Sequence, residues 1–198
     1  LCYLNPDLGD HDSFISVAEQ LKDHDINVPK IISHHPTVGV TIQNDLGDDD
    51  LISLMNDQNR EFLINKSLDL LVDIHKADIK GLMHLSSSDL KDQMNKFKYI
   101  FCERFLDISA DGLVNDLIMN ALDNLQECPK NNCHFDFERR NLILDDRNEV
   151  NVIDFQDMCI APIGIDIAGI LLDHYMSFDR SIIKKDLKYF LDHSDISL

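Results

Sequence analysis

Four polar side chains between positions 134 and 154 combine residue types and a spacing that could do chemistry together. His134 and Asp136 form an H-x-D motif, Asn141 follows five residues after the aspartate, and Asp154 comes thirteen residues after Asn141. A carboxylate such as that of Asp136 can orient and deprotonate a hydroxyl group that attacks a phosphate. The oxygens of Asn141 and Asp154 are ligands that Mg²⁺ prefers, and no Cys or His ligand is required. The pattern predicts phosphoryl transfer, with Asp136 as catalytic base and Asn141 and Asp154 as metal ligands.

The sequence around this motif predicts the elements that must position it. A polar turn separates residues 142–144 from residues 150–153, which predicts a hairpin that returns the chain to the same cleft. The alternative is a chance H-x-D motif in a surface loop with a solvated Asp154, and the complete pattern argues against it. Upstream, a long amphipathic helix is expected over residues 112–126, with one apolar stripe of Val114, Leu117, Ile118, Ala121, Leu122 and Leu125.

The rest of the chain predicts helices interrupted by short β-structure. A helix is expected around residues 14–21, and strands 30–32 and 38–42 are expected to form a hairpin through a turn at residues 34–37. The order of elements predicts an α+β fold with two lobes, 1–43 and 44–198, divided by turn-forming residues 44–48. Further helices are expected at 50–55, 60–76 and 88–105, and a final helix from about Asp166 to Leu172.

Composition narrows the classes of partner. The chain has 198 residues, with 18 Lys and Arg against 36 Asp and Glu, which gives a net charge of −18. A polyanion of this kind would be repelled by nucleic acids and anionic lipids, so neither is an expected partner. The longest apolar run is too short to span a bilayer, and five cysteines without a C-x-x-C motif predict free thiols in a reducing cytoplasm. We expect a cytoplasmic protein with a small-molecule substrate, and the sequence does not indicate its oligomeric state.

The motif and its surroundings resemble the aminoglycoside phosphotransferase-like small-molecule kinases, in which H-x-D, Asn and then I-D-F/W follow one another. The sequence is most similar to the subgroup of anomeric N-acetylmuramate/N-acetylglucosamine kinases. The resemblance covers positions 1 to about 173 in the right order. It is most specific at Ile153-Asp154-Phe155-Gln156-Asp157 and the Pro and Asp that follow.

This resemblance implies a protein-kinase-like fold of two lobes, ATP and Mg²⁺ as cofactors, and an amino-sugar substrate of cell-wall recycling. It implies that His134 and Asp166 brace the catalytic loop. Glu103 and Glu138 are candidate contacts to the sugar. The hinge that meets the adenine edge would be formed by Gln43, Asn44, Asp45 and Leu46.

The sequence also departs from the family pattern. Phe135 replaces a basic residue, and Glu138 replaces a frequent histidine and is expected to add negative charge beside the cleft. No Gly-rich phosphate loop occurs, and positions 1–4 would form the third strand without its usual lysine. The first two strands would then lie upstream of position 1 and the last helices beyond position 198, so the N-lobe is expected to be truncated.

The sequence leaves alternative functions open. One is a degraded or truncated homologue without catalytic activity, and another is an aminoglycoside- or choline-type kinase of the same fold. His-Asp pairs occur at 11–12 and 24–25, but the further ligands of a His-Asp phosphohydrolase are missing around them. The adjacent His34 and His35 could attract a transition metal, although neighbouring side chains on a turn point in different directions.

Overall fold

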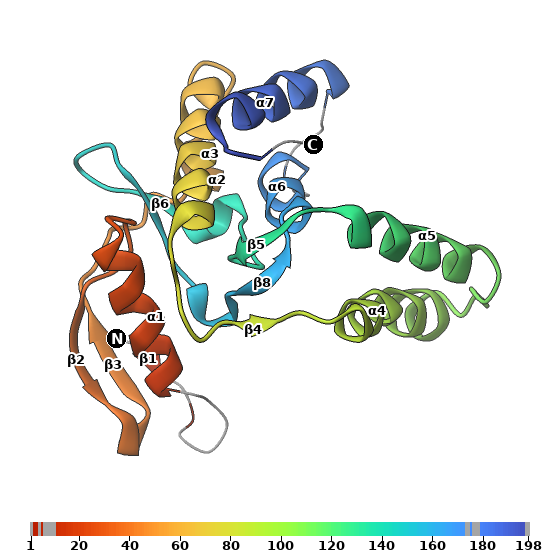
Figure 1. Ribbon diagram of the computed structural model, residues 1–198, viewed down its shortest axis with the longest axis horizontal. Helices are drawn as coiled ribbons and strands as arrows, with labels where there is room; N and C mark the ends of the chain where they lie inside the picture. Colours follow the sequence, from red (N-terminus) through yellow and green to blue (C-terminus); the bar gives the residue numbers. More distant parts are fainter. Residues whose placement is uncertain (1, 4, 6–10, 173–174, 176–178, 197–198) are drawn as a thin grey trace.

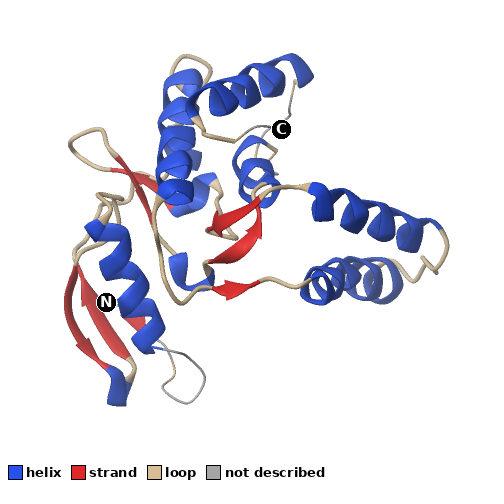
Figure 2. Cartoon of the chain, viewed as in Figure 1, coloured by secondary structure: helices blue, strands red, loops and turns tan. Residues whose placement is uncertain are grey.

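The computed structural model describes residues 2–3, 5, 11–172, 175 and 179–196. Leu1 and Leu4, which belong to the strand expected at positions 1–4, therefore lie outside the described residues. The α+β class predicted from the sequence is confirmed, with small sheets set among helices (Figures 1 and 2). No helix in the described part of the chain has the length and apolar character needed to cross a bilayer. The helices are α1 (His11–Asp23), α2 (Leu51–Leu54), α3 (Arg60–Lys76), α4 (Ser87–Lys96), α5 (Leu113–Glu127), α6 (Gly164–Leu171) and α7 (Arg180–His193).

The N-terminal part is a three-stranded antiparallel sheet covered by one helix. Its strands β1 (Cys2–Tyr3), β2 (Ile31–His35) and β3 (Val40–Gln43) lie in the order β1-β3-β2, and α1 runs alongside them in Figure 1. The buried side chains of α1 are Val17, Ala18 and Leu21, which repeat at helical spacing and join the main core.

The predicted hairpin forms, but its turn lies two residues later than expected. His34 and His35 belong to β2, where they pair with Thr41 and Val40, and the His34 ring lies 2.9 Å from the Thr41 hydroxyl. The turn consists of a 3₁₀ segment, Pro36–Val38, and Gly39 in a left-handed conformation at φ 69°. Proline cannot donate to the ladder and glycine accepts positive φ, so these two residues fix where the strands end.

The main core is organised around α3, which buries nine residues. It packs against α7, a helix that the sequence analysis missed by treating the helix near Asp166 as the last one. The apolar spacing of Ile183, Leu187 and Phe190 was the available signal. Two polar contacts fix the pairing: Arg60 donates to Asp186 at 2.6 Å, and the Tyr189 hydroxyl donates to Asp69 at 3.0 Å.

Two further small sheets lie beside the candidate catalytic loop. The predicted hairpin is present as β6 (Leu142–Leu144) and β7 (Val150–Val152). The second sheet, in the order β4-β8-β5, was not predicted. Its strands carry no clear apolar alternation: β4 (Met83–His84) has two residues, β5 (Lys130–Cys133) is largely polar, and β8 (Cys159–Pro162) ends in proline. Pairing with neighbours far apart in the sequence, rather than local pattern, makes these segments strands.

The expected helices at 88–105 and 112–126 form a hairpin that projects from β4 and β5 in Figure 1. The first is α4, which continues without a break as a π-helix over Phe97–Phe105, and the second is α5. Leu117, expected in the buried stripe of α5, is 62% exposed, whereas Ile118 and Leu122 are buried against α4. A helix that packs against a single neighbour can bury only a narrow part of its apolar face.

Helix α6 packs directly on the candidate catalytic loop, and glycine makes this contact possible. It begins at Gly164, two residues before the expected start at Asp166. A Cβ atom on Gly169 would lie 2.8 Å from the backbone oxygen of Phe137, closer than real Cβ contacts allow. The helix can therefore approach the loop backbone this closely only with glycine at position 169.

The Arg60–Asp186 pair should contribute measurably to stability because Asp186 is only 2% exposed. We expect Arg60→Ala to lower the free energy of unfolding by about 3 kcal/mol, since it leaves a buried carboxylate without its cation. Urea-induced unfolding followed by far-ultraviolet circular dichroism measures this change. Lys185→Ala is the control: it breaks an exposed pair with Glu61 between the same two helices and should cost under about 1 kcal/mol. Equal losses in the two variants would contradict the prediction.

Gly169→Ala should force α6 and the loop apart. We expect a loss of about 1–3 kcal/mol in the free energy of unfolding, as for other overpacked sites. Amide hydrogen exchange over residues 134–141 should become faster, which reports the displaced loop directly. Gly164→Ala on the same helix is the matched control, because its Cβ would make only an ordinary contact, 3.5 Å from Cys128 Sγ. Unchanged exchange in Gly169→Ala would show that the loop does not depend on this contact.

Candidate active site

A buried carboxylate holds the start of the candidate catalytic loop. Asp166, in the first turn of α6, accepts hydrogen bonds from the backbone N–H groups of His134 at 2.6 Å and Phe135 at 2.9 Å. Phe135 has a φ of 74°, a left-handed conformation that is unfavourable for phenylalanine and that these bonds help to hold. Burial raises the pKa of Asp166 to about 7, while the two backbone hydrogen bonds act in the opposite direction.

The His134 side chain links the loop to the strand that leads to Asp154. It is fully buried, and its Nε2 atom lies 2.8 Å from the backbone oxygen of Ile153. The backbone N–H of Asp136 donates to Nδ1 at 3.3 Å, so Nδ1 is the acceptor and Nε2 carries the proton. Burial lowers the pKa of His134, which agrees with this neutral form. Both ring nitrogens are thus engaged with the backbone, in keeping with the bracing role expected for this residue.

The Asp136 carboxylate is oriented by two neighbours and remains partly open to solvent. Asn141 Nδ2 donates to Asp136 Oδ2 at 2.9 Å and to its backbone oxygen at 2.8 Å. Arg140 donates to Oδ2 at 3.1 Å and more distantly to Oδ1 at 3.3 Å. The side chain is 39% exposed. Oδ1 therefore keeps acceptor capacity for a hydroxyl group of a bound molecule.

Arg140 is a candidate site residue that the sequence analysis did not identify. Its Nε atom lies 3.3 Å from Glu138 Oε2, and its guanidinium also pairs with Asp136. The Asp136 carboxylate, followed by that of Glu138, raises the pKa of Arg140. The negative charge that Glu138 was expected to add is therefore offset in part, because one Arg140 guanidinium is shared by two carboxylates. The available signal was a basic residue four positions after the motif aspartate.

Asp154 lies where the hairpin returns to the loop. The backbone N–H of Ile153 donates to the backbone oxygen of Asn141 at 3.0 Å, which brings the chain around the two expected metal ligands together. Asp154 adopts a left-handed conformation at φ 58° and precedes a 3₁₀ turn, Phe155–Asp157.

The side-chain oxygens of Asn141 and Asp154 are suitable ligands for a hard divalent cation. Asp154 is exposed, and within the described part of the chain its carboxylate has no hydrogen bond or ion pair. Asn141 uses its amide nitrogen to bind Asp136, so its Oδ1 atom is left for another partner. A carboxylate and an amide oxygen, with further positions for water and phosphate oxygens, form the donor set that Mg²⁺ prefers.

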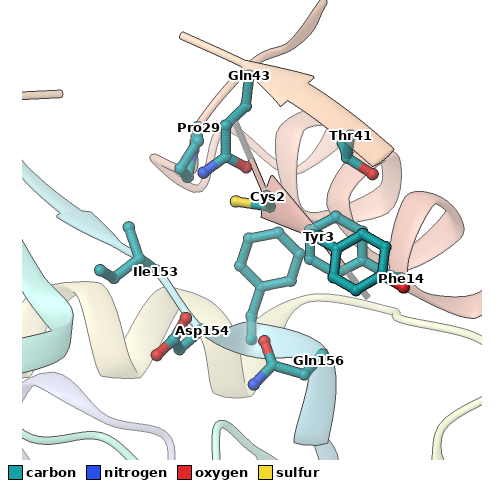
Figure 3. A pocket seen from close by; sticks show the side chains of 10 residues that line it. Cys2, Tyr3, Phe14, Pro29, Thr41, Gln43, Ile153, Asp154 and Gln156 are labelled. Carbon is teal, nitrogen blue, oxygen red and sulfur yellow. The ribbon is translucent and has the colours of Figure 1, made fainter. Parts of the chain in front are cut away.

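A cavity of about 420 Å³ lies between Asp154 and the N-terminal sheet. In Figure 3, Asp154 and Gln156 lie on one side of it, and Gln43 and Cys2 face them from the other. A neighbouring cavity of about 290 Å³ is lined by the predicted hinge residues Gln43, Asn44, Asp45 and Leu46. The two cavities share walls formed by Pro29, Gln43 and Ile153.

Glu103 is not brought together with the other candidate residues. It lies on the π-helix that follows α4, with its carboxylate 4.0 Å from Lys98 Nζ. Among the described residues it makes no hydrogen bond or ion pair with any other candidate site residue. Lys98 is buried and pairs more closely with Asp111 at 2.5 Å, so Glu103 belongs to the polar network that joins α4 to α5.

Comparison with known proteins identifies relatives of this chain. The chain is 25% identical over 174 residues to an N-acetylmuramate/N-acetylglucosamine kinase of Pseudomonas aeruginosa. The aligned region covers 83% of this chain and 50% of that protein. It is 27% identical over 182 residues to the protein of the same name from Neisseria meningitidis, covering 85% of this chain and 54% of the relative. The chain thus spans about half the length of the curated relatives it matches.

The fold has solved counterparts. The structure of a choline/ethanolamine kinase family protein from Mesorhizobium loti superposes with a TM-score of 0.69 at 11% identity, covering 98% of this chain and 63% of that one. This similarity confirms the predicted protein-kinase-like fold. Residues 8–194 match the family described as APH, the phosphotransferase enzyme family. This match spans nearly the whole chain, and the protein therefore belongs to the phosphotransferase enzyme family.

Proposed function

We propose that the protein transfers the terminal phosphoryl group of ATP to a hydroxyl group of an amino sugar. The acceptor is the anomeric hydroxyl of N-acetylmuramate or N-acetylglucosamine, in cell-wall recycling. The observation that carries the proposal is the 3.0 Å hydrogen bond from Ile153 to Asn141, which joins the loop bearing Asp136 to the return strand bearing Asp154. A base and two oxygen ligands then face one cleft, as phosphoryl transfer requires.

Asp136 acts as the base in this proposal. Asn141 and Arg140 hold its carboxylate, mainly through Oδ2, and Oδ1 receives the sugar hydroxyl. The carboxylate orients the hydroxyl oxygen for attack and takes its proton as the new oxygen–phosphorus bond forms and the bond to the ADP leaving group breaks. His134 does not exchange protons with the substrate, because both its nitrogens are occupied by backbone groups.

Asn141 and Asp154 would hold Mg²⁺, through Asn141 Oδ1 and the Asp154 carboxylate. When bound, the ion neutralises negative charge on the phosphate oxygens of the transition state. The left-handed backbone at Asp154 turns its carboxylate out of the strand direction and toward the 420 Å³ cavity that it lines. Residues 1–43 form the nucleotide side of the site and residues 44–198 the acceptor side, with the adenine edge against Gln43–Leu46, where the smaller cavity lies.

The acceptor class rests on the relatives and on the loop itself. The matched relatives from Pseudomonas aeruginosa and Neisseria meningitidis are both named N-acetylmuramate/N-acetylglucosamine kinases. Glu138, beside Asp136 and paired with Arg140, offers a carboxylate for sugar hydroxyl groups. Glu103 contributes only if the α4–α5 hairpin approaches the bound sugar. A choline-type acceptor is the second candidate, because the fold is similar to that of a choline/ethanolamine kinase family protein.

ATP consumption with Mg²⁺ should occur with an N-acetylated amino sugar and not with choline or an aminoglycoside. We expect Asp136→Asn to lower kcat by about 10²- to 10⁴-fold, the usual contribution of a general base, with little change in KM for ATP. Asp146→Asn, at an exposed position of the β6–β7 turn, is the control and should retain activity. Turnover with choline alone would support the second candidate. Nucleotide binding without turnover of any acceptor would support a non-catalytic homologue.

Asp154→Ala should remove the effect of Mg²⁺ on nucleotide binding. In wild-type protein, calorimetric titration should show tighter ATP binding with Mg²⁺ than with a chelator, because Asp154 would hold the ion at the site and the ion would offset phosphate charge. The variant should bind ATP with the same, weaker affinity in both conditions and should show no turnover. Mg²⁺ that strengthens binding equally in Asp154→Ala and wild type would mean that the metal ligand was misassigned.

A further inference from the structure

Three buried side chains with metal-binding atoms meet behind the start of the catalytic loop. His75 lies in the last turn of α3, Cys133 ends β5, and Asp166 lies in the first turn of α6. One ligand atom from each lies within 4.8 Å of the other two. Their exposed fractions are 6%, 0% and 1%. This His75–Cys133–Asp166 cluster shares no proposed ligand with the Mg²⁺ site at Asn141 and Asp154.

His75 lacks the partners that a buried imidazole requires. Neither ring nitrogen has a hydrogen-bond partner among the described residues, and the ring packs edge-on against Phe190 at 5.8 Å. Buried polar groups are nearly always paired, and an unpaired one is costly. Burial also lowers the pKa of His75 to about 4, so the ring is neutral near pH 7 and offers a lone pair.

The Asp166 carboxylate also has capacity to accept a cation. Among the described residues, no Lys or Arg forms an ion pair with the buried Asp166 carboxylate, whose partners are two backbone N–H groups and the Cys133 thiol. Each carboxylate oxygen has two lone pairs, so it can keep its bond to the loop and still coordinate an ion. A divalent cation with one thiolate and one carboxylate is electrically neutral, which makes burial of the whole unit favourable compared with a lone carboxylate.

We propose that His75, Cys133 and Asp166 bind one Zn²⁺ ion. Imidazole nitrogen, thiolate sulfur and carboxylate oxygen are the ligands that Zn²⁺ takes in proteins, whereas Mg²⁺ favours an all-oxygen set. Binding forms a Zn–S bond and releases the Cys133 thiol proton to solvent. Three protein ligands leave one tetrahedral position for a water molecule or a backbone oxygen.

The ion would act on the loop through the residues that already hold it. Cys133 immediately precedes His134, and Asp166 accepts the N–H groups of His134 and Phe135. Coordination would therefore join the end of α3, the end of β5 and the start of α6 at the point where the catalytic loop begins. In this proposal Zn²⁺ has a structural role. Its binding should therefore raise the thermal stability of the protein, an effect that can be measured without any catalytic turnover.

The first test uses the metal alone on protein purified in the presence of a chelator. Added Zn²⁺ should remain bound at one ion per chain after gel filtration, as measured by elemental analysis, and should raise the Tm. Co²⁺ in its place should give the near-ultraviolet charge-transfer band that requires a thiolate ligand. The absence of this band in wild-type protein would overturn the proposal without any variant.

Variants then distinguish this cluster from adventitious binding. His75→Leu and Cys133→Ser should each lose the bound ion and the Zn²⁺-dependent rise in Tm. His75→Leu removes two unpaired nitrogens, so without metal it should be at least as stable as wild type, and its loss of Zn²⁺ cannot be attributed to unfolding. Cys102→Ser, at a buried thiol in the π-helix, and His35→Ala, next to His34, should keep the ion. Retention of Zn²⁺ in His75→Leu, or its loss in His35→Ala, would show that the ion binds elsewhere.

Discussion

The arrangement of the candidate site depends on one buried carboxylate that receives two backbone N–H groups. Asp166 is 1% exposed and accepts from the backbone N–H groups of His134 and Phe135, the residues that begin the candidate catalytic loop. Charge-assisted hydrogen bonds of this kind are stronger than neutral ones, and they favour the left-handed conformation of Phe135. Helix α6 supplies both the carboxylate and the bare backbone of Gly169 that supports the same loop from behind.

A second set of contacts connects the segment around Asp154 to α1 and to Asn27. The Phe14 ring of α1 stacks on the Phe155 ring, with centroids 5.0 Å apart, immediately after Asp154. The backbone N–H of Val152 donates to the oxygen of Asn27 at 2.9 Å, just before the strand ends. The short segment around Asp154 therefore contacts α1, Asn27 and the candidate catalytic loop, and Asp154 itself lines the cavity.

Charged residues are unevenly distributed around the candidate site. With a net charge of −18, the protein would repel an anionic nucleotide unless cations are present where phosphates bind. Arg140 offsets one of the two negative charges of Asp136 and Glu138 at the loop, whereas Asp154 remains exposed and without a protein cation among the described residues. A divalent metal at Asp154 is consistent with this distribution. The projecting α4–α5 hairpin is stabilised separately, through Lys98 and its carboxylate partners.

Local pattern predicted the long helices other than α7, the two hairpins and the motif from which the candidate chemistry was inferred. Helical or alternating spacing of apolar residues is a property of neighbouring positions, so α3, α5 and β6–β7 could be located from the sequence. The resemblance to kinases followed from the spacing of four motif residues: His134, Asp136, Asn141 and Asp154. The sheet β4-β8-β5 could not be predicted, because its strands have little pattern of their own and form by pairing with distant segments. Packing between distant segments also separates Glu103 from the loop, exposes Leu117 and brings His75 to Asp166. Each of these contacts depends on how whole elements pack, which only the tertiary structure decides.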